Sequence, residues 1–240
     1  MLSDAELLAL WEAGQGLTPV ARALMILKAD CPDLPIGALA ALSIGARDAR
    51  VLSVREQVFG RTFASLSTCP ECGETVEQTF SVEEVRMPSV AASPHLMSEE
   101  VDGRIVRFKL PDSDDLSALA GCDTVAAARA LLVARCVVDQ PGGNVAPFRL
   151  ADAAIQAIAE RMARADPQAD IQFAISCPSC CGTWEETFDI VSFFWSELTA
   201  WSVRILDQVH RLASAYGWSE ADILAVTPSR REMYLARIGP

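Results

Sequence analysis

The sequence has 240 residues, of which 51% are hydrophobic, and a formal net charge of -12 at neutral pH. This length suits one large domain or two small ones, and the apolar content is enough to form a sizeable core. The acidic balance argues against a simple binder of nucleic-acid phosphates or anionic lipid, because such proteins need clustered Lys and Arg.

The first sixty residues are predicted to be helical. Ser3 and Glu6 have the spacing of a capping box, and Thr18 precedes Pro19 at a favoured first helical position. Gly60 fits the end of the last helix in this region. The expected helices span residues 5–11, 19–28, 36–42 and 43–59.

The character of the sequence changes after residue 60. Segments 62–68 and 75–82 are rich in Thr, Val and Phe and alternate partially, so we expect two strands flanking Cys69-Pro70-Glu71-Cys72. Segment 83–100 contains prolines and little periodicity and is expected to be mostly loop. Segment 104–110 alternates imperfectly and is interpreted as a strand.

Helical patterns return in the second half of the chain. They cover residues 111–138, with a break near Gly121, and residues 151–165, with a turn-rich loop at 140–144 between them. Strands are then expected at 171–176 and 183–190. The chain continues in a long amphipathic helix and two short ones, at 191–216, 220–226 and from 228 onward. The buried face of the last helix is expected to carry Met233, Tyr234, Leu235 and Ile238.

Two segments of the chain match each other. Each has an apolar strand, a Cys-Pro-x-Cys turn, a glycine, and a Thr-rich strand ending in Thr-Phe. In this comparison Cys181 stands as an extra residue before Gly182. A Cys-x-x-Cys turn presents two sulfurs to one ion, and zinc prefers four thiolates in a tetrahedron. We therefore predict one structural zinc ion per chain, with the ligands Cys69, Cys72, Cys177 and Cys180.

The sequence is also compatible with alternatives to this ligand set. The repeat spacing favours Cys180 as the fourth ligand, whereas the register of the following glycine favours Cys181. The turns could also be independent and hold buried free thiols, or form a dithiol redox site or another zinc-dependent enzyme site. The other three cysteines, in apolar helical surroundings, are expected to be small core residues: Cys31, Cys122 and Cys136.

No pattern of catalytic residues is visible. His95 and His210 have no metal-ligand spacing, and neither a phosphate-binding loop nor a nucleophile motif occurs. Acidic pairs such as Glu185-Glu186 fit solvated strand faces. A closed four-sulfur shell leaves no position for substrate, so the sequence predicts a structural protein and no enzyme.

The expected location is the cytoplasm. The N-terminus lacks a basic region followed by an apolar run, and no apolar stretch reaches the length of a membrane span. Thiols stay reduced in the cytoplasm, where paired cysteines more often bind metal than form disulfides.

Several stretches together resemble small proteins encoded beside phage-tail-like contractile injection systems, which are similar to T4-type baseplate hub and assembly proteins. The resemblance covers nearly the whole chain. Besides the two cysteine turns, it rests on Leu10-Trp11-Glu12, Pro35-Ile36-Gly37, Ile44-Gly45-Ala46-Arg47-Asp48, Phe59-Gly60, Ala165-Asp166-Pro167-Gln168-Ala169-Asp170, Phe194-Trp195-Ser196-Glu197, Val209-His210, Ala215-Tyr216-Gly217-Trp218 and Glu220-Ala221-Asp222-Ile223-Leu224.

The resemblance implies a component or assembly factor of a baseplate, with other baseplate or hub proteins as partners. The fold is expected to be α+β and mainly helical, around a discontinuous zinc-ribbon-like β core of two strand-turn-strand units. The expected parts are an N-terminal helical region at 1–60, the β core at 61–86 and 170–190, a mainly helical insertion at 87–169, and a C-terminal helical region at 191–240. Neither a nucleic-acid partner nor a membrane span is expected.

Overall fold

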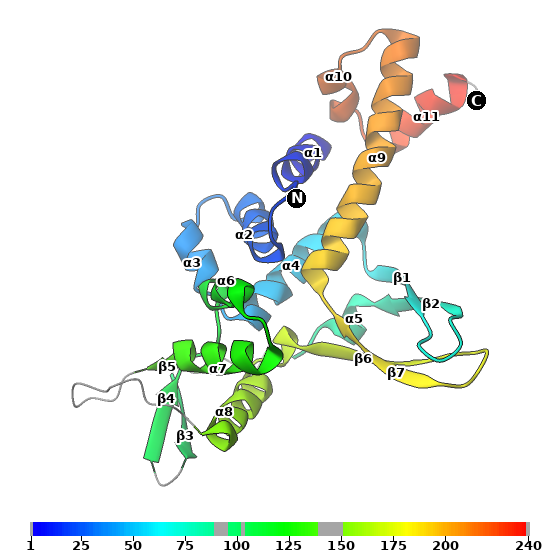
Figure 1. Cartoon of the computed structure of the whole chain (residues 1–240). Coiled ribbons are helices and arrows are strands. Elements are labelled where there is room, and N and C mark those ends of the chain that lie inside the picture. The colour runs from blue at the N-terminus through cyan, green and yellow to red at the C-terminus, as the bar shows by residue number, and fades with distance from the viewer. Residues whose placement is uncertain (1, 89–95, 102–103, 139–150, 239–240) are drawn as a thin grey trace.

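The computed structural model describes residues 2–88, 96–101, 104–138 and 151–238. The chain is mainly helical with small antiparallel sheets, as the sequence predicts (Figure 1). Pro94, His95 and the predicted loop at 140–144 lie outside the described residues. No helix within the described ranges combines the length and the apolar character that a membrane span needs.

Four helices form the N-terminal region, as predicted. They are α1 (Asp4–Ala13), α2 (Pro19–Asp30), α3 (Ile36–Ala40) and α4 (Ile44–Phe59). The Ser3–Glu6 capping box is present, because the backbone N–H of Ser3 donates to Glu6 and that of Glu6 donates to the Ser3 hydroxyl. Gly60 ends α4 with a φ of 87°, a conformation that favours glycine.

Two β-hairpins carry the cysteine turns. They are β1–β2 (Thr62–Thr68 and Thr75–Ser81) and β6–β7 (Ile171–Ser176 and Thr183–Phe188). Phe63 lies opposite Phe80 in the first hairpin, and Ile171 lies opposite Phe188 in the second. The predicted strands therefore exist, and each turn lies at the tip of a two-stranded sheet.

The middle of the chain forms a helical part with a three-stranded sheet. Its elements are α5 (Val82–Val85), β3 (Met97–Val101), β4 (Arg104–Phe108), α6 (Ser113–Ser117), η1 (Ala118–Gly121), α7 (Val125–Cys136), β5 (Val137–Val138), α8 (Asp152–Ala165) and η2 (Pro167–Ala169). A small separate core lies between α7, α8 and this sheet, and it includes Phe108, Cys136 and Ile158.

The expectation of mostly loop at 83–100 was wrong in part. The segment contains most of α5 and most of β3. Strand β3 pairs with β4, and Met97 lies opposite Phe108. The local pattern is weak, but Met97 is buried in the core of α7 and α8. Strand formation here depends on this tertiary packing, which single-sequence periodicity does not show.

The long helix α9 (Ile190–Tyr216) connects the parts of the molecule. It packs on α1, α2 and α4 along its course and on α10 (Glu220–Ala225) and α11 (Pro228–Ile238) near its C-terminal end (Figure 1). Its buried face contributes Phe194, Trp195 and Leu198 to the main core. Gly217, with a φ of 66°, ends the helix.

Three burial predictions need correction. Met233 is 58% exposed, because the inward stripe of α11 begins at the buried Arg231 and continues three, four and seven residues later through Tyr234, Leu235 and Ile238. Cys31 and Cys122 are only half-buried, since they lie at the ends of α2 and η1. Cys136 is buried as expected.

Arg55 fixes the start of the first hairpin against α9. Its side chain is 1% exposed and makes paired hydrogen bonds with both carboxylate oxygens of Glu197. It also donates to the carbonyl oxygens of Gly60 and Thr62, and its guanidinium lies 3.7 Å from the ring centre of Phe63. The orientation of β1 relative to α4 and α9 is thereby set.

Aromatic side chains hold the bases of the two hairpins together. Phe80 of β2 lies with its ring centre 4.8 Å from that of Phe173 in β6. Phe63 and Phe188 meet edge to face at 5.5 Å, and Phe193 of α9 packs against both. This cluster positions the strands so that the two hairpin tips lie close to each other.

Candidate metal centre

The first cysteine turn has the hydrogen bonds of a tight knuckle. The backbone N–H of Cys69 donates to the carbonyl oxygen of Glu74 at 2.8 Å, and that of Gly73 donates to the carbonyl oxygen of Cys69 at 3.0 Å. Gly73 has a φ of 76°, which glycine adopts without steric cost. The turn therefore folds back on itself and places Cys69 and Cys72 on the same side.

The second turn has the same two backbone hydrogen bonds as the first. The N–H of Cys177 donates to Gly182 at 2.8 Å, and the N–H of Cys181 donates to Cys177 at 3.0 Å. Cys181 has a φ of 61° and thus occupies the position of Gly73. The interpretation of Cys181 as an extra residue was wrong: the two repeats have equal length, and a cysteine replaces the glycine.

Four sulfur atoms converge where the two tips meet. The Sγ atoms of Cys69, Cys72, Cys177 and Cys180 all lie within 4.8 Å of one another. The Cys69–Cys180 and Cys72–Cys177 sulfur pairs are each 3.6 Å apart. A tetrahedral zinc site with Zn–S bonds of about 2.3 Å has sulfur–sulfur distances of about 3.8 Å, so these four residues fit the ion.

Burial divides the four cysteines into two pairs. Cys69 and Cys177, the first residue of each turn, are buried, whereas Cys72 and Cys180 are exposed. The buried pair packs with Val76 and Ile175 in a small apolar cluster beneath the tips. Each hairpin therefore contributes one sheltered and one exposed sulfur.

The thiol pKa values reflect the crowding of the four sulfurs. The backbone N–H of Cys180 lowers the pKa of Cys177 to about 7. The N–H of Gly182 acts in the same direction on Cys180, but hydrogen bonds with the neighbouring sulfurs raise the pKa of Cys180 to about 12. Four adjacent thiolates repel one another, and a divalent cation between them compensates their charge.

Glu71 contacts the opposite hairpin beside the sulfurs. The Cys180 thiol lies 3.8 Å from a carboxylate oxygen of Glu71. A Cβ atom at Gly182 would lie only 2.5 Å from the same carboxylate. Because Gly182 has no side chain, it leaves room for the carboxylate of Glu71.

One polar contact between the hairpins was missed by sequence reasoning. Glu186, predicted to be on a solvated strand face, accepts a hydrogen bond of 2.5 Å from the hydroxyl of the buried Ser67. Gln78 donates to the same hydroxyl at 3.2 Å. The pairing spans 119 positions of sequence, and no local pattern signals it.

Neither the other cysteines nor His210, all within the described residues, extend the centre. Cys181 is exposed and outside the four-sulfur group, and His210 is exposed on α9. Burial raises the pKa of the Cys136 thiol to about 12, and the nearby Asp115 acts in the same direction. Over the described part of the chain, the four cysteines are the one group of His, Cys, Asp or Glu side chains that meets the geometry of a metal site.

Comparison with known proteins identifies a family. A family model described as "T4 bacteriophage base plate protein" matches residues 5–140, which is more than half of the chain. The match includes the first cysteine turn and ends before the second. Neither a curated protein nor a solved structure matched the chain.

Proposed function

The chain belongs to the T4 bacteriophage base plate protein family, and we propose that it is a structural or assembly protein in the baseplate of a phage-like contractile injection system. We further propose that one structural zinc ion stabilises it. The convergence of four sulfurs from two distant hairpins carries the zinc assignment.

The proposed zinc ion would be held by Cys69, Cys72, Cys177 and Cys180. When bound, it supplies a cross-link between the two hairpins and no open coordination position. An isolated two-stranded hairpin is only marginally stable in water. A cross-link between the tips would therefore add stability that neither hairpin has by itself. The Phe cluster at the base and the metal at the tip would together hold the hairpins at both ends.

The proposed partners are other baseplate or hub proteins, and the proposed location is the cytoplasm and then the assembled particle. The role is structural, because four protein sulfurs fill the tetrahedron that a catalytic zinc keeps partly open. The family membership supports this role.

A dithiol redox protein or zinc-dependent enzyme is the alternative function. The exposure of Cys72 and Cys180 favours it, since reactive thiols must be accessible. Both turns are followed by strands, whereas thioredoxin-like sites place the cysteines at the start of a helix.

Metal analysis of the purified chain distinguishes the two functions. We expect about one zinc ion per chain, and thiols that react with a disulfide reagent only after a chelator is added. Thiols that cycle between dithiol and disulfide without bound metal would favour the redox alternative.

Particle association tests the baseplate role. The whole gene cluster is expressed, and purified particles and free tagged protein are compared by mass spectrometry. We expect the chain in particles or bound to baseplate subunits. Its absence from both would contradict the proposal, and its presence only with free subunits would assign it to assembly.

A further inference from the structure

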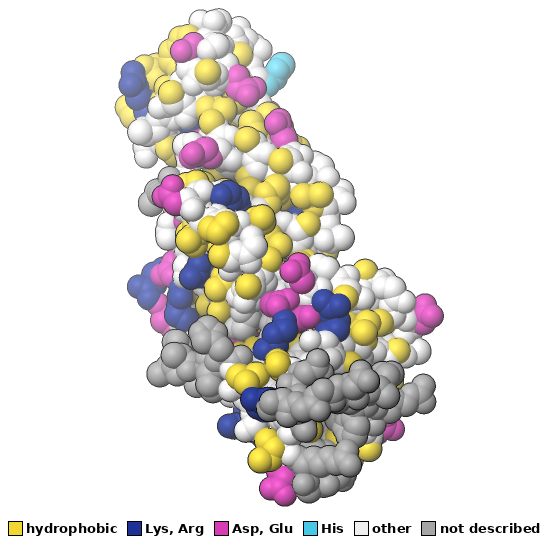
Figure 2. All heavy atoms as spheres, turned by 90° about the vertical axis from the view of Figure 1, so that its left-hand side faces the viewer, with side chains coloured by type: hydrophobic (Ala, Val, Ile, Leu, Met, Phe, Trp, Pro, Cys, Tyr) yellow, Lys and Arg dark blue, Asp and Glu magenta, His cyan; other side chains and the backbone are white. Residues whose placement is uncertain are grey.

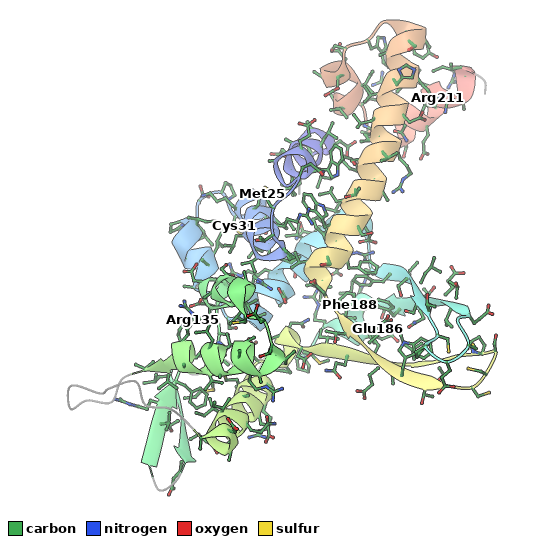
Figure 3. All side chains as sticks on the ribbon, viewed as in Figure 1. Met25, Cys31, Arg135, Glu186, Phe188 and Arg211 are labelled. Atoms are coloured by element: carbon green, nitrogen blue, oxygen red, sulfur yellow. The ribbon has the colours of Figure 1, made fainter. Side chains whose placement is uncertain are left out.

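A groove of about 280 Å³ lies between the two hairpins. It is lined by consecutive residues of β1 (65–67) and of β7 (186–188), but only by alternate residues of β2 and β6. Successive side chains of a strand point to opposite faces, so a strand that lines a groove with one face contributes only alternate residues. Because β1 and β7 contribute consecutive residues, their backbone edges border the groove. Figure 3 shows Glu186 and Phe188 between the hairpins.

These two edges have no strand partner within the described residues. The hydrogen-bonded strand order places β1 beside β2 alone and β7 beside β6 alone. An edge strand presents unpaired N–H and C=O groups, and proteins commonly use such edges to bind an extended segment of another chain. The two edges thus form a preformed position for an added strand.

The groove combines an aromatic floor with an apolar rim. The floor consists of Phe80, Phe173, Phe188 and Phe193, which also hold the hairpin bases together. Leu66 lies on the rim, where its side chain is 73% exposed and therefore accessible to a binding partner. Alternate apolar side chains of an added strand would pack on this floor, while its backbone bonds to an edge.

The charge of the groove and of its hairpins is uniformly negative. Glu186 and Asp189 line the groove, which has no Lys or Arg in its lining. Residues 62–81 and 171–188 contain no Lys or Arg and five glutamates: Glu71, Glu74, Glu77, Glu185 and Glu186. A zinc ion with four thiolates would add two negative charges. The face in Figure 2, by contrast, intersperses acidic with basic side chains.

We propose that this groove binds an extended, basic segment of another baseplate protein, which adds as a strand at the β1 and β7 edges. Lys or Arg side chains of that segment would face Glu186 and Asp189, and apolar side chains on one face of the segment would cover the aromatic floor. Leu66 points to the opposite face of β1 and would contact the other face of the segment. The identity of the partner class rests on the proposed function. A second copy of this acidic chain does not fit, because like charges would meet.

Peptide binding to the zinc-loaded 240-residue chain tests the groove. The probes are overlapping twelve-residue peptides from the co-encoded tail proteins, together with random-sequence peptides of matched charge. Binding is measured by fluorescence anisotropy, and hydrogen exchange locates the site. We expect basic peptides with alternating apolar residues to bind and to protect residues 65–67 and 186–188 from exchange.

Two adjacent glutamates provide a matched pair of variants. Glu186 lines the groove, whereas Glu185 points to the other face of β7, and both substitutions to Lys change the charge equally. We expect Glu186→Lys to weaken binding about tenfold or more, because it reverses a charge at the contact, and Glu185→Lys to change it less than threefold. Zinc content must stay equal in the two variants.

A second pair avoids the Ser67–Glu186 hydrogen bond. Leu66→Ser removes an apolar side chain from the groove rim without changing the charge, and Ala64→Ser alters an exposed position of the same strand outside the groove. We expect only Leu66→Ser to weaken binding. The proposal would be overturned if both variants of each pair lost peptide affinity equally, or if hydrogen-exchange protection appeared outside the groove. A preference for acidic peptides or self-association of the chain would also overturn it. Binding of random basic peptides but of no tail-protein peptide would support the groove and overturn its baseplate partner.

Discussion

Cys180 and Cys181 are adjacent, both exposed, and differ in their place within the turn. Cys180 belongs to the four-sulfur group, whereas Cys181 takes the positive-φ position that Gly73 has in the first turn. A non-glycine residue in this backbone region is uncommon and costs roughly 1 kcal/mol. The proposed ligand set therefore assigns the two neighbouring thiols different roles.

Replacing these two thiols separately tests the ligand assignment. We expect Cys180→Ser to lose tight zinc binding, because three sulfurs remain around the ion, and Cys181→Ser to bind about one zinc ion per chain. Zinc content after dialysis against a weak chelator is the measurement. The opposite pattern would make Cys181 the fourth ligand.

Arg55 provides a residue-scale test of stability. Its side chain is buried and donates four hydrogen bonds, two to Glu197 and one each to the carbonyl oxygens of Gly60 and Thr62. Removing one partner of a buried pair leaves the other charge uncompensated, so Arg55→Met is expected to lower the free energy of unfolding by about 3 kcal/mol.

Arg61 serves as the control for that variant. It forms ion pairs with Glu56 and Glu83, but its side chain is 68% exposed. Surface ion pairs contribute little to stability, so Arg61→Met should lower the free energy of unfolding by about 1 kcal/mol or less. Urea unfolding followed by circular dichroism measures both. Equal losses would show that Arg55 does not fix the hairpin as described.

At the scale of elements, the start of α6 depends on buried charge. Asp115 accepts hydrogen bonds from Lys109 and Arg135 although it is 2% exposed. Burial alone would raise the pKa of Asp115, but the hydrogen bond from Lys109, the N–H of Asp112 and the two positive charges hold it below the ordinary value. The ionised form is therefore favoured by folding.

A pH dependence follows from the lowered pKa of Asp115. The stabilisation is fully present above about pH 4, where the carboxyl group of the unfolded chain is ionised, and it is lost as the pH falls through the lower folded-state value. We expect Asp115→Asn to lower the free energy of unfolding by about 1–3 kcal/mol at neutral pH, with wild type and variant converging in acid.

The neighbouring Asp114 is the control for this experiment. It lies on the same helical turn but is exposed. Asp114→Asn should change stability by a few tenths of a kcal/mol, the size of an exposed helix-dipole interaction. Urea midpoints measured from pH 3 to pH 7 give the result, and curves that stay parallel for Asp115→Asn would contradict the assignment.

Elements with strong local signals could be predicted from the sequence. Capping residues such as Ser3 and Thr18 predicted where helices begin. Apolar segments before the two cysteine turns and Thr-rich segments after them predicted the four hairpin strands. Strand β3 could not be predicted, because only its contact with β4 and α8 makes it a strand. The cysteine turns were recognisable by spacing, whereas Ser67–Glu186 and Arg55–Glu197 join residues that no local pattern relates.

At the scale of the whole molecule, the metal is expected to stabilise one part selectively. The hairpins share few contacts besides the Phe cluster and the tips, whereas α1, α2 and α4 pack into the main core with α9. Removing zinc with a chelator should therefore increase hydrogen exchange in residues 62–81 and 171–188 and leave α2 and α4 unchanged.

Circular dichroism provides the accompanying measurement. The helical signal should persist after chelation, since no helix depends on the tips, and restoring one equivalent of zinc should restore the exchange protection. Loss of the helical signal on chelation would contradict a local role for the metal.

The ribosome synthesises the two halves of the proposed metal centre at different times. Cys72 and Cys177 are 105 positions apart, so at about 5–20 residues per second a ribosome needs roughly 5–20 s to pass from one to the other. During that interval the first hairpin of the nascent chain carries two unpaired thiols on a marginally stable sheet. Tight binding of the proposed zinc ion requires the second turn, so we expect fragments that end before residue 180 not to bind zinc tightly.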